Sequence, residues 1–95
     1  MKRIIIKLTG AVAAQAGTKS TTLTLDKDES YADVIQKLGQ LFPNLIGLII
    51  DTDGKTMLSS NMFLANGQDY VMVGMWDKIP QDGDTLLIVS PVTGG

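Results

Sequence analysis

Cysteine and histidine are both absent from this 95-residue sequence. Without cysteine, the chain cannot form a disulfide framework, a thiol nucleophile or a Cys-ligated zinc or iron–sulfur site. Without histidine, it lacks the commonest general base and the commonest metal ligand among side chains. These absences make the chain a poor candidate for an enzyme acting alone. We expect no metal site, and no cofactor bound by the chain itself.

Positive charge is also scarce, since eight Lys and Arg residues face ten Asp and Glu residues and the formal net charge is −2. A protein that binds nucleic acid by neutralising phosphates needs an excess of basic residues, so we expect no nucleic-acid partner. No apolar run approaches the roughly 18 residues of a membrane span, and Lys7 interrupts the one that opens the chain. We therefore expect no membrane partner and a soluble, cytoplasmic protein.

The composition that remains is typical of one small globular domain. Hydrophobic residues make up 44% of the chain and charged residues 19%, which excludes a disordered chain. We expect a single domain over residues 1–91, followed by a flexible C-terminal tail over residues 92–95.

The N-terminal quarter predicts an antiparallel hairpin. Residues 2–9 and 20–25 alternate between apolar and polar side chains, as half-buried strands do. Residues 10–17 between them are small, and they predict a loop longer than a tight two-residue turn. The side chains expected to share the buried face are Ile4, Ile6, Leu8, Leu23 and Leu25.

Residues 31–42 predict the main helix. Ser30 and Asp33 form a variant of the capping box at its start, and Pro43 ends it. Gly39 weakens the helix by about 1 kcal/mol relative to alanine. The apolar stripe on one face of this helix is made by Tyr31, Val34, Ile35, Leu38, Leu41 and Phe42.

The second half of the chain predicts shorter elements. Residues 45–50 are either a short strand or a helical turn followed by one, and periodicity does not decide between them. Residues 61–65 predict a strand that runs into the hairpin signal Asn66-Gly67, with its return over residues 68–73. Residues 85–90 predict a final strand that is apolar on both faces and therefore central in its sheet.

This order of elements favours an α+β fold. The helix covers one face of the sheet, and the final strand lies beside the first and parallel to it. The pattern predicts a β-grasp arrangement, a mixed sheet with one main helix packed on one face.

The C-terminal segment carries the most specific pattern of the chain. A Gly83-Asp84 turn precedes an apolar strand, which is followed by Pro91-Val92-Thr93-Gly94-Gly95. This segment resembles the end of the MoaD/ThiS family of ubiquitin-like sulfur carriers. Upstream, the resemblance includes Leu41-Phe42-Pro43-Asn44-Leu45 and Phe63-Leu64-Ala65-Asn66-Gly67.

The resemblance implies chemistry at the C-terminal carboxylate of Gly95. A MoeB/ThiF-like adenylyltransferase would use ATP to form an acyl-adenylate, and a sulfur donor would then leave a thiocarboxylate. The sulfur would pass to an acceptor enzyme such as the large subunit of molybdopterin synthase, a cysteine synthase or an enzyme of thiazole synthesis. Glycine at positions 94 and 95 lets the main chain thread a narrow partner channel without a Cβ clash.

The resemblance also implies a partner-docking face. MoaD-like carriers expose an apolar residue at the last strand position, which here is Val89. Strand alternation then turns Leu87 outward as well, and Ile5 of the neighbouring first strand extends the patch. Leu86 and Ile88 would lie in the core. The tail is expected to add the partner contacts Pro91, Val92 and Thr93.

Several alternatives remain open at this stage. The activated Gly95 could be joined to a lysine of another protein, as in a ubiquitin-like modifier, or the domain could bind a partner without tail chemistry. Residues 71–80 could fold over the outer face and bury it. Trp76 is either a lid on the core or an interface anchor. Asp51, Asp53 and Gly54 are read as a turn rather than a calcium loop.

Overall fold

The structure is a computed structural model that describes residues 1–91. The predicted tail, residues 92–95, lies outside the described residues. The helices and strands are β1 (Lys2–Lys7), α1 (Gly10–Ala16), β2 (Ser20–Leu25), α2 (Tyr31–Leu41), the 3₁₀ helix η1 (Pro43–Leu45), β3 (Met62–Ala65), β4 (Asp69–Val71) and β5 (Thr85–Val89).

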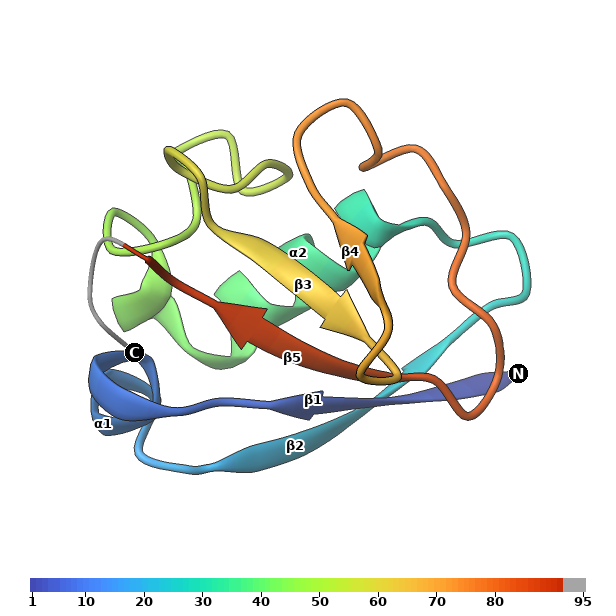
Figure 1. The fold of residues 1–95 in the computed structure, drawn as a ribbon, viewed down its shortest axis with the longest axis horizontal. Helices are drawn as coiled ribbons and strands as arrows, with labels where there is room; N and C mark the ends of the chain where they lie inside the picture. The colour runs from blue at the N-terminus through green and yellow to red at the C-terminus, as the bar shows by residue number, and fades with distance from the viewer. Residues whose placement is uncertain (92–95) are drawn as a thin grey trace.

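The five strands form one mixed sheet in the order β2-β1-β5-β3-β4. Strand β1 is antiparallel to β2 and parallel to β5, while β3 is antiparallel to both β5 and β4. Helix α2 lies across one face of this sheet (Figure 1). The arrangement is a β-grasp fold, and the central position of β5, parallel to β1, confirms the prediction made from its two apolar faces.

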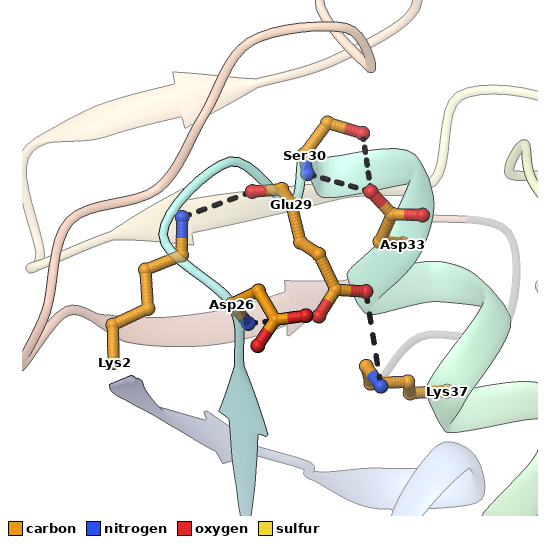
Figure 2. A network of polar contacts seen from close by, with 6 residues as sticks. All are labelled: Lys2, Asp26, Glu29, Ser30, Asp33 and Lys37. Carbon is orange, nitrogen blue, oxygen red and sulfur yellow. Dashed lines mark hydrogen bonds and ion pairs between the residues drawn. The ribbon is translucent and has the colours of Figure 1, made fainter.

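Helix α2 begins at the predicted capping box. The Ser30 backbone N–H donates to the Asp33 carboxylate at 2.8 Å, and the Ser30 hydroxyl donates to the same oxygen at 3.2 Å (Figure 2). The predicted stripe is largely buried, but Leu41 is 54% exposed, which contradicts its assignment to the stripe. Leu41 is the last helical residue and lies at the edge of the stripe, where the core no longer reaches it.

The predicted loop over residues 10–17 was wrong, because most of it forms helix α1. Alanine is the best helix former, and this segment is rich in it. Val12 anchors the helix in the core with no exposed surface. Gly17 ends it in the left-handed conformation, with φ of 77°, and donates its N–H to the Ala13 carbonyl at 2.8 Å.

Residues 43–58 resolve an ambiguity of the sequence. The chain forms the 3₁₀ helix η1 and then only isolated bridges, which pair Ile46 with Ile50 and Ile50 with Met57. The helical-turn alternative is therefore closer to the observed structure than a regular strand is. Leu45, Ile49 and Ile50 have no exposed surface, so the segment packs as part of the core.

The hairpin predicted at Asn66-Gly67 is confirmed, with β3 antiparallel to β4. Both turn residues have positive φ, 55° and 70°. The connection is one residue longer than a two-residue turn, because Ala65 pairs with Asp69 and Gln68 donates its N–H to the Ala65 carbonyl. The return strand therefore begins at Asp69 rather than at Gln68.

Trp76 is a lid on the core, and its alternative interpretation as an interface anchor was wrong. The side chain is 8% exposed, and its ring meets Phe63 edge-to-face at 6.1 Å between centroids. Its backbone carbonyl accepts the Ala32 N–H at 2.8 Å, and the Lys78 carbonyl accepts the Tyr31 N–H at 2.9 Å. The irregular segment 72–80 thus satisfies two donors in the first turn of α2.

A buried lysine, which the sequence analysis missed, joins three parts of the chain. Lys2 is only 5% exposed. Its ammonium donates to the carbonyls of Lys27 at 3.1 Å, Glu29 at 2.9 Å and Pro80 at 2.9 Å. Figure 2 shows the contact with Glu29, whose carboxylate also accepts the Asp26 N–H at 2.8 Å. All three donors of the ammonium are therefore used.

Replacing Gly39 with alanine is expected to raise the free energy of unfolding by up to about 1 kcal/mol, because Gly39 lies inside α2. An added Cβ would meet Cδ1 of Ile46 at 3.3 Å, but Ile46 is 41% exposed and its side-chain end can move. Urea unfolding of Gly39→Ala measures the change. A loss of stability would show that Ile46 is held rigidly.

Candidate functional site

The orientation of β5 matches the prediction from sequence. Leu86 and Ile88 are 0% and 1% exposed and face α2, whereas Leu87 and Val89 are partly exposed on the opposite face. This follows from strand alternation, because the helix-covered face must hold the core. The assignment of the inner and outer faces of β5 is therefore confirmed.

The neighbouring strands extend the apolar surface around Leu87 and Val89. Leu64 of β3 lies opposite Leu87, and Met62 lies opposite Val89. On the other side, Ile5 of β1 pairs with Thr85 and is partly exposed. The directly opposed pairs, Leu64 with Leu87 and Met62 with Val89, have Cβ atoms about 4.5–5.5 Å apart, close enough to touch, and Ile5 lies diagonally from Leu87. We call the resulting surface the outer sheet patch; its members are Ile5, Met62, Leu64, Leu87 and Val89.

The contribution of β3 to the outer sheet patch was not predicted from the sequence. Phe63 and Ala65 of this strand are buried, so alternation turns Met62 and Leu64 to the outer face. The signal was present, because the hairpin at Asn66-Gly67 identified the strand. The sequence alone did not show that β3 lies next to β5.

Polar groups border the outer sheet patch on the side of β2. Thr22 of β2 pairs with Ile5, and the exposed Lys7 pairs with Leu87. On the other side, Tyr70 of β4 pairs with Leu64 and is 51% exposed. An apolar centre with a polar or aromatic border is the usual composition of a protein-docking surface.

Segment 71–80 does not cover this patch. Its largest buried side chain, Trp76, packs against Phe63 on the face covered by helix α2. The outer sheet patch remains partly exposed. The alternative in which this segment buries the outer face was therefore wrong.

The described chain leaves the sheet at Pro91, an exposed residue that directly follows β5 and Ser90. The predicted functional residues Val92, Thr93, Gly94 and Gly95 lie outside the described residues, so their roles stay predictions. Strand β1 is parallel to β5, and helix α1 directly follows β1. Helix α1 therefore lies at the end of the sheet where β5 also ends (Figure 1).

Residues 51–56 form the ordinary turn expected from the sequence. The Asp53 carboxylate accepts the N–H groups of Lys55 at 2.8 Å and Thr56 at 3.0 Å, as well as the Thr56 hydroxyl at 2.9 Å. The Lys55 N–H is the main cause of a lowered pKa of Asp53. Its small contribution to stability is therefore present at neutral pH and lost as the pH falls through that lowered value.

Among residues 1–91, no three Asp or Glu side chains are grouped to hold a metal ion. No helix within the same residues is both long and apolar enough to cross a membrane.

Comparisons with known proteins agree with this architecture. The sequence pattern of the ThiS family matches residues 6–95. Small archaeal modifier protein 3 of Haloferax volcanii is 32% identical over 79 residues, which are 83% of this chain and 84% of that protein.

Two solved structures have the same fold. The crystal structure of H. volcanii small archaeal modifier protein 1 superposes with a TM-score of 0.80 at 23% identity, over 97% of this chain and 100% of that chain. The solution structure of small archaeal modifier protein 1 from Methanosarcina acetivorans gives a TM-score of 0.75 at 26% identity, over 100% and 98% of the two chains.

The fold and its apolar outer face define a ubiquitin-like β-grasp protein. Since the family pattern covers all but the first five residues, the chain belongs to the ThiS family. This confirms the resemblance seen in the C-terminal segment.

Proposed function

We propose that this protein is a cytoplasmic sulfur carrier that works through the C-terminal carboxylate of Gly95. The observation that carries the proposal is the ThiS-family match, which extends through residue 95 and so includes the Gly-Gly end. The position of the last strand supports it. Strand β5 is held between β1 and β3, which gives the segment after Pro91 a rigid starting point.

The proposed reaction takes place in a MoeB/ThiF-like adenylyltransferase. A carboxylate oxygen of Gly95 attacks the α-phosphorus of ATP, forms an acyl-adenylate and releases pyrophosphate. Hydrosulfide from a sulfur donor then attacks the carbonyl carbon and displaces AMP, so that a C–S bond replaces the C–O bond and the thiocarboxylate remains. The partner must exclude water, because the acyl-adenylate is easily hydrolysed. The acceptor of the sulfur is a biosynthetic enzyme such as a molybdopterin synthase large subunit or a cysteine synthase.

A second function, protein modification, is favoured by one specific observation. The relative with 32% identity is a small archaeal modifier protein. In this alternative, a lysine amine of a target protein attacks the same acyl-adenylate and forms an isopeptide bond to Gly95, again releasing AMP. The two functions share the activation step and differ only in the nucleophile.

Mass spectrometry of the protein isolated from its own cells separates the two functions. Sulfur carriage predicts an intact chain in which one sulfur replaces one oxygen at Gly95. Modification predicts isopeptide-linked C-terminal remnants on lysines of other proteins. An unaltered C-terminus, with no remnants in cells that contain the activating enzyme, would contradict both functions.

The outer sheet patch is expected to dock the activating enzyme. Val89→Asp places a charge in an apolar contact, so we expect the dissociation constant to rise at least about tenfold. The free energy of unfolding should fall by only about 1 kcal/mol, because Val89 is partly exposed. Calorimetric titration and urea unfolding measure the two effects.

Ile88→Asp is the matched control for that substitution. Ile88 is 1% exposed, so its replacement buries an unpaired charge and is expected to unfold the domain. If Val89→Asp unfolds the domain in the same way, or leaves binding unchanged, the outer sheet patch is not the docking surface.

A further inference from the structure

A separate polar site lies beyond Tyr70, at the β4 edge of the sheet. A pocket of about 300 Å³ separates β4 from the segment that leads into β5. Its polar lining includes Tyr31, Asn66, Asp69, Lys78 and Asp84. Asp84 immediately precedes β5, whereas Pro91 follows it, so the pocket and the exit of the chain lie at opposite ends of that strand.

The side chain of Tyr31 gives this pocket an unused hydrogen-bonding group. Tyr31 as a whole is only 7% exposed, and within residues 1–91 no hydrogen bond engages its hydroxyl, which lines the pocket. The hydroxyl oxygen itself is open to solvent through the pocket. Burial, and then the charges of Asp84 and Asp69, raise the pKa of Tyr31. The hydroxyl is therefore neutral near pH 7, and its oxygen can accept a hydrogen bond.

The two carboxylates give the pocket negative charge. Asp84 is held in place, since its oxygens accept the Asn66 side-chain amide at 2.9 Å and the Gln81 N–H at 2.8 Å. Asp69 pairs with Ala65, so alternation directs both toward the helix-covered face, where Tyr31 lies. Within residues 1–91, no side-chain hydrogen bond or ion pair engages the Asp69 carboxylate.

The cation already present at the pocket does not neutralise it. Lys78 lines the pocket, but no ion pair joins it to Asp69 or Asp84 within the described chain. The pocket thus offers a free carboxylate, a second fixed carboxylate and a phenol oxygen to a positively charged donor. A planar cation that carries several N–H donors could donate hydrogen bonds to all of these acceptors together.

The border of the pocket is apolar and exposed, which favours a protein over a free ion. Tyr70 and Ile79 line the pocket and are 51% and 50% exposed. Val73, in the neighbouring turn, is 76% exposed. Clustered apolar side chains of this kind are typical of interaction surfaces. They would contact the aliphatic stem of a long cationic side chain.

We propose that this pocket receives an arginine side chain from a partner protein. The guanidinium fork can donate two parallel hydrogen bonds to Asp69 and still direct an N–H toward Tyr31. The pocket is separate from the exit of the described chain at Pro91. Strand β5, about 17 Å long at roughly 3.3 Å per residue, lies between Asp84 and that exit, so both ends of the strand can be engaged at once.

Titration of the ¹⁵N-labelled full chain with Nα-acetyl-arginine N-methylamide tests the proposal. We expect saturable NMR shifts at the amides of Asn66, Asp69 and Lys78, with a dissociation constant in the millimolar range for so small a probe. The citrulline analogue has the same shape without the charge and should give no saturable shifts. Equal binding of citrulline, or tighter binding of the lysine analogue, overturns the assignment to arginine.

Substitutions separate the roles of the pocket residues. Asp69→Asn and Tyr31→Phe should each weaken arginine binding at least about fivefold, because each removes an acceptor. Asp77→Asn, at an exposed position outside the pocket lining, is the matched control and should leave binding unchanged. If Tyr31→Phe impairs folding, Asp69→Asn decides the result, since Asp69 is exposed.

Lys78→Gln tests whether the chain's own lysine is the occupant. Because the Lys78 ammonium forms no ion pair with the pocket carboxylates within the described chain, removing it should change arginine affinity by less than about threefold, as expected of an exposed charge. An increase of about tenfold or more would show that Lys78 competes for the pocket, and the proposal of a partner arginine would fail.

Discussion

Deletion of Gly95 is expected to abolish activation of the protein while leaving its stability unchanged. The shortened chain still ends in a carboxylate, on Gly94, but that group lies about 3.3–3.6 Å short of its position in the full chain. Because a misplacement of 1 Å can cost about 100-fold in rate, ATP–pyrophosphate exchange by the activating enzyme should fall at least that far. The thermal midpoint should stay within about 3 °C, as for a surface change.

Gly95→Ala is the matched control for the deletion. It keeps the chain length and the carboxylate and adds only a methyl group, so it tests the width of the partner channel separately from the reach of the chain. We expect exchange between that of the natural chain and that of the deletion. Full exchange by the shortened chain would show that Gly95 does not supply the reacting carboxylate.

Lys2→Met is expected to cause a large loss of stability, because Lys2 is a buried residue of β1. Methionine retains much of the side-chain volume but removes the ammonium that donates hydrogen bonds to three backbone carbonyls. The contact with Pro80 is buried, whereas those with Lys27 and Glu29 are partly open to water. Leaving a buried acceptor unpaired costs about 1–3 kcal/mol, so we expect a total of about 3–5 kcal/mol.

Urea unfolding and the thermal midpoint measure this loss. For a domain of this size, about 3–5 kcal/mol corresponds to a decrease of roughly 15–30 °C. Lys19→Met is the matched control, because Lys19 is exposed and its replacement should stay within about 0.5 kcal/mol. A loss below about 1 kcal/mol for Lys2→Met would show that water replaces the ammonium at the three carbonyls.

The sequence alone determined those features in which buried side chains recur with a regular spacing along one short segment. The alternation of β1 and β5 identified their inner faces, and the spacing of Tyr31, Val34, Ile35 and Leu38 identified α2 and its buried side. Two apolar faces placed β5 at the centre of the sheet before any strand pairing was known. The Gly-Gly end pointed to the family because its pattern lies within a few consecutive residues.

Only the tertiary structure decided the features that depend on contacts between distant residues. Helix α1 has seven residues, too few to be stable alone, and it forms because Val12 is buried in the core. The addition of Met62 and Leu64 to the outer sheet patch required β3 to pair with β5. The partners of Lys2 lie up to 78 positions away, and Trp76 became a core lid only when its segment met Phe63. No periodic pattern records such contacts, because folding brings these groups together from separate parts of the chain.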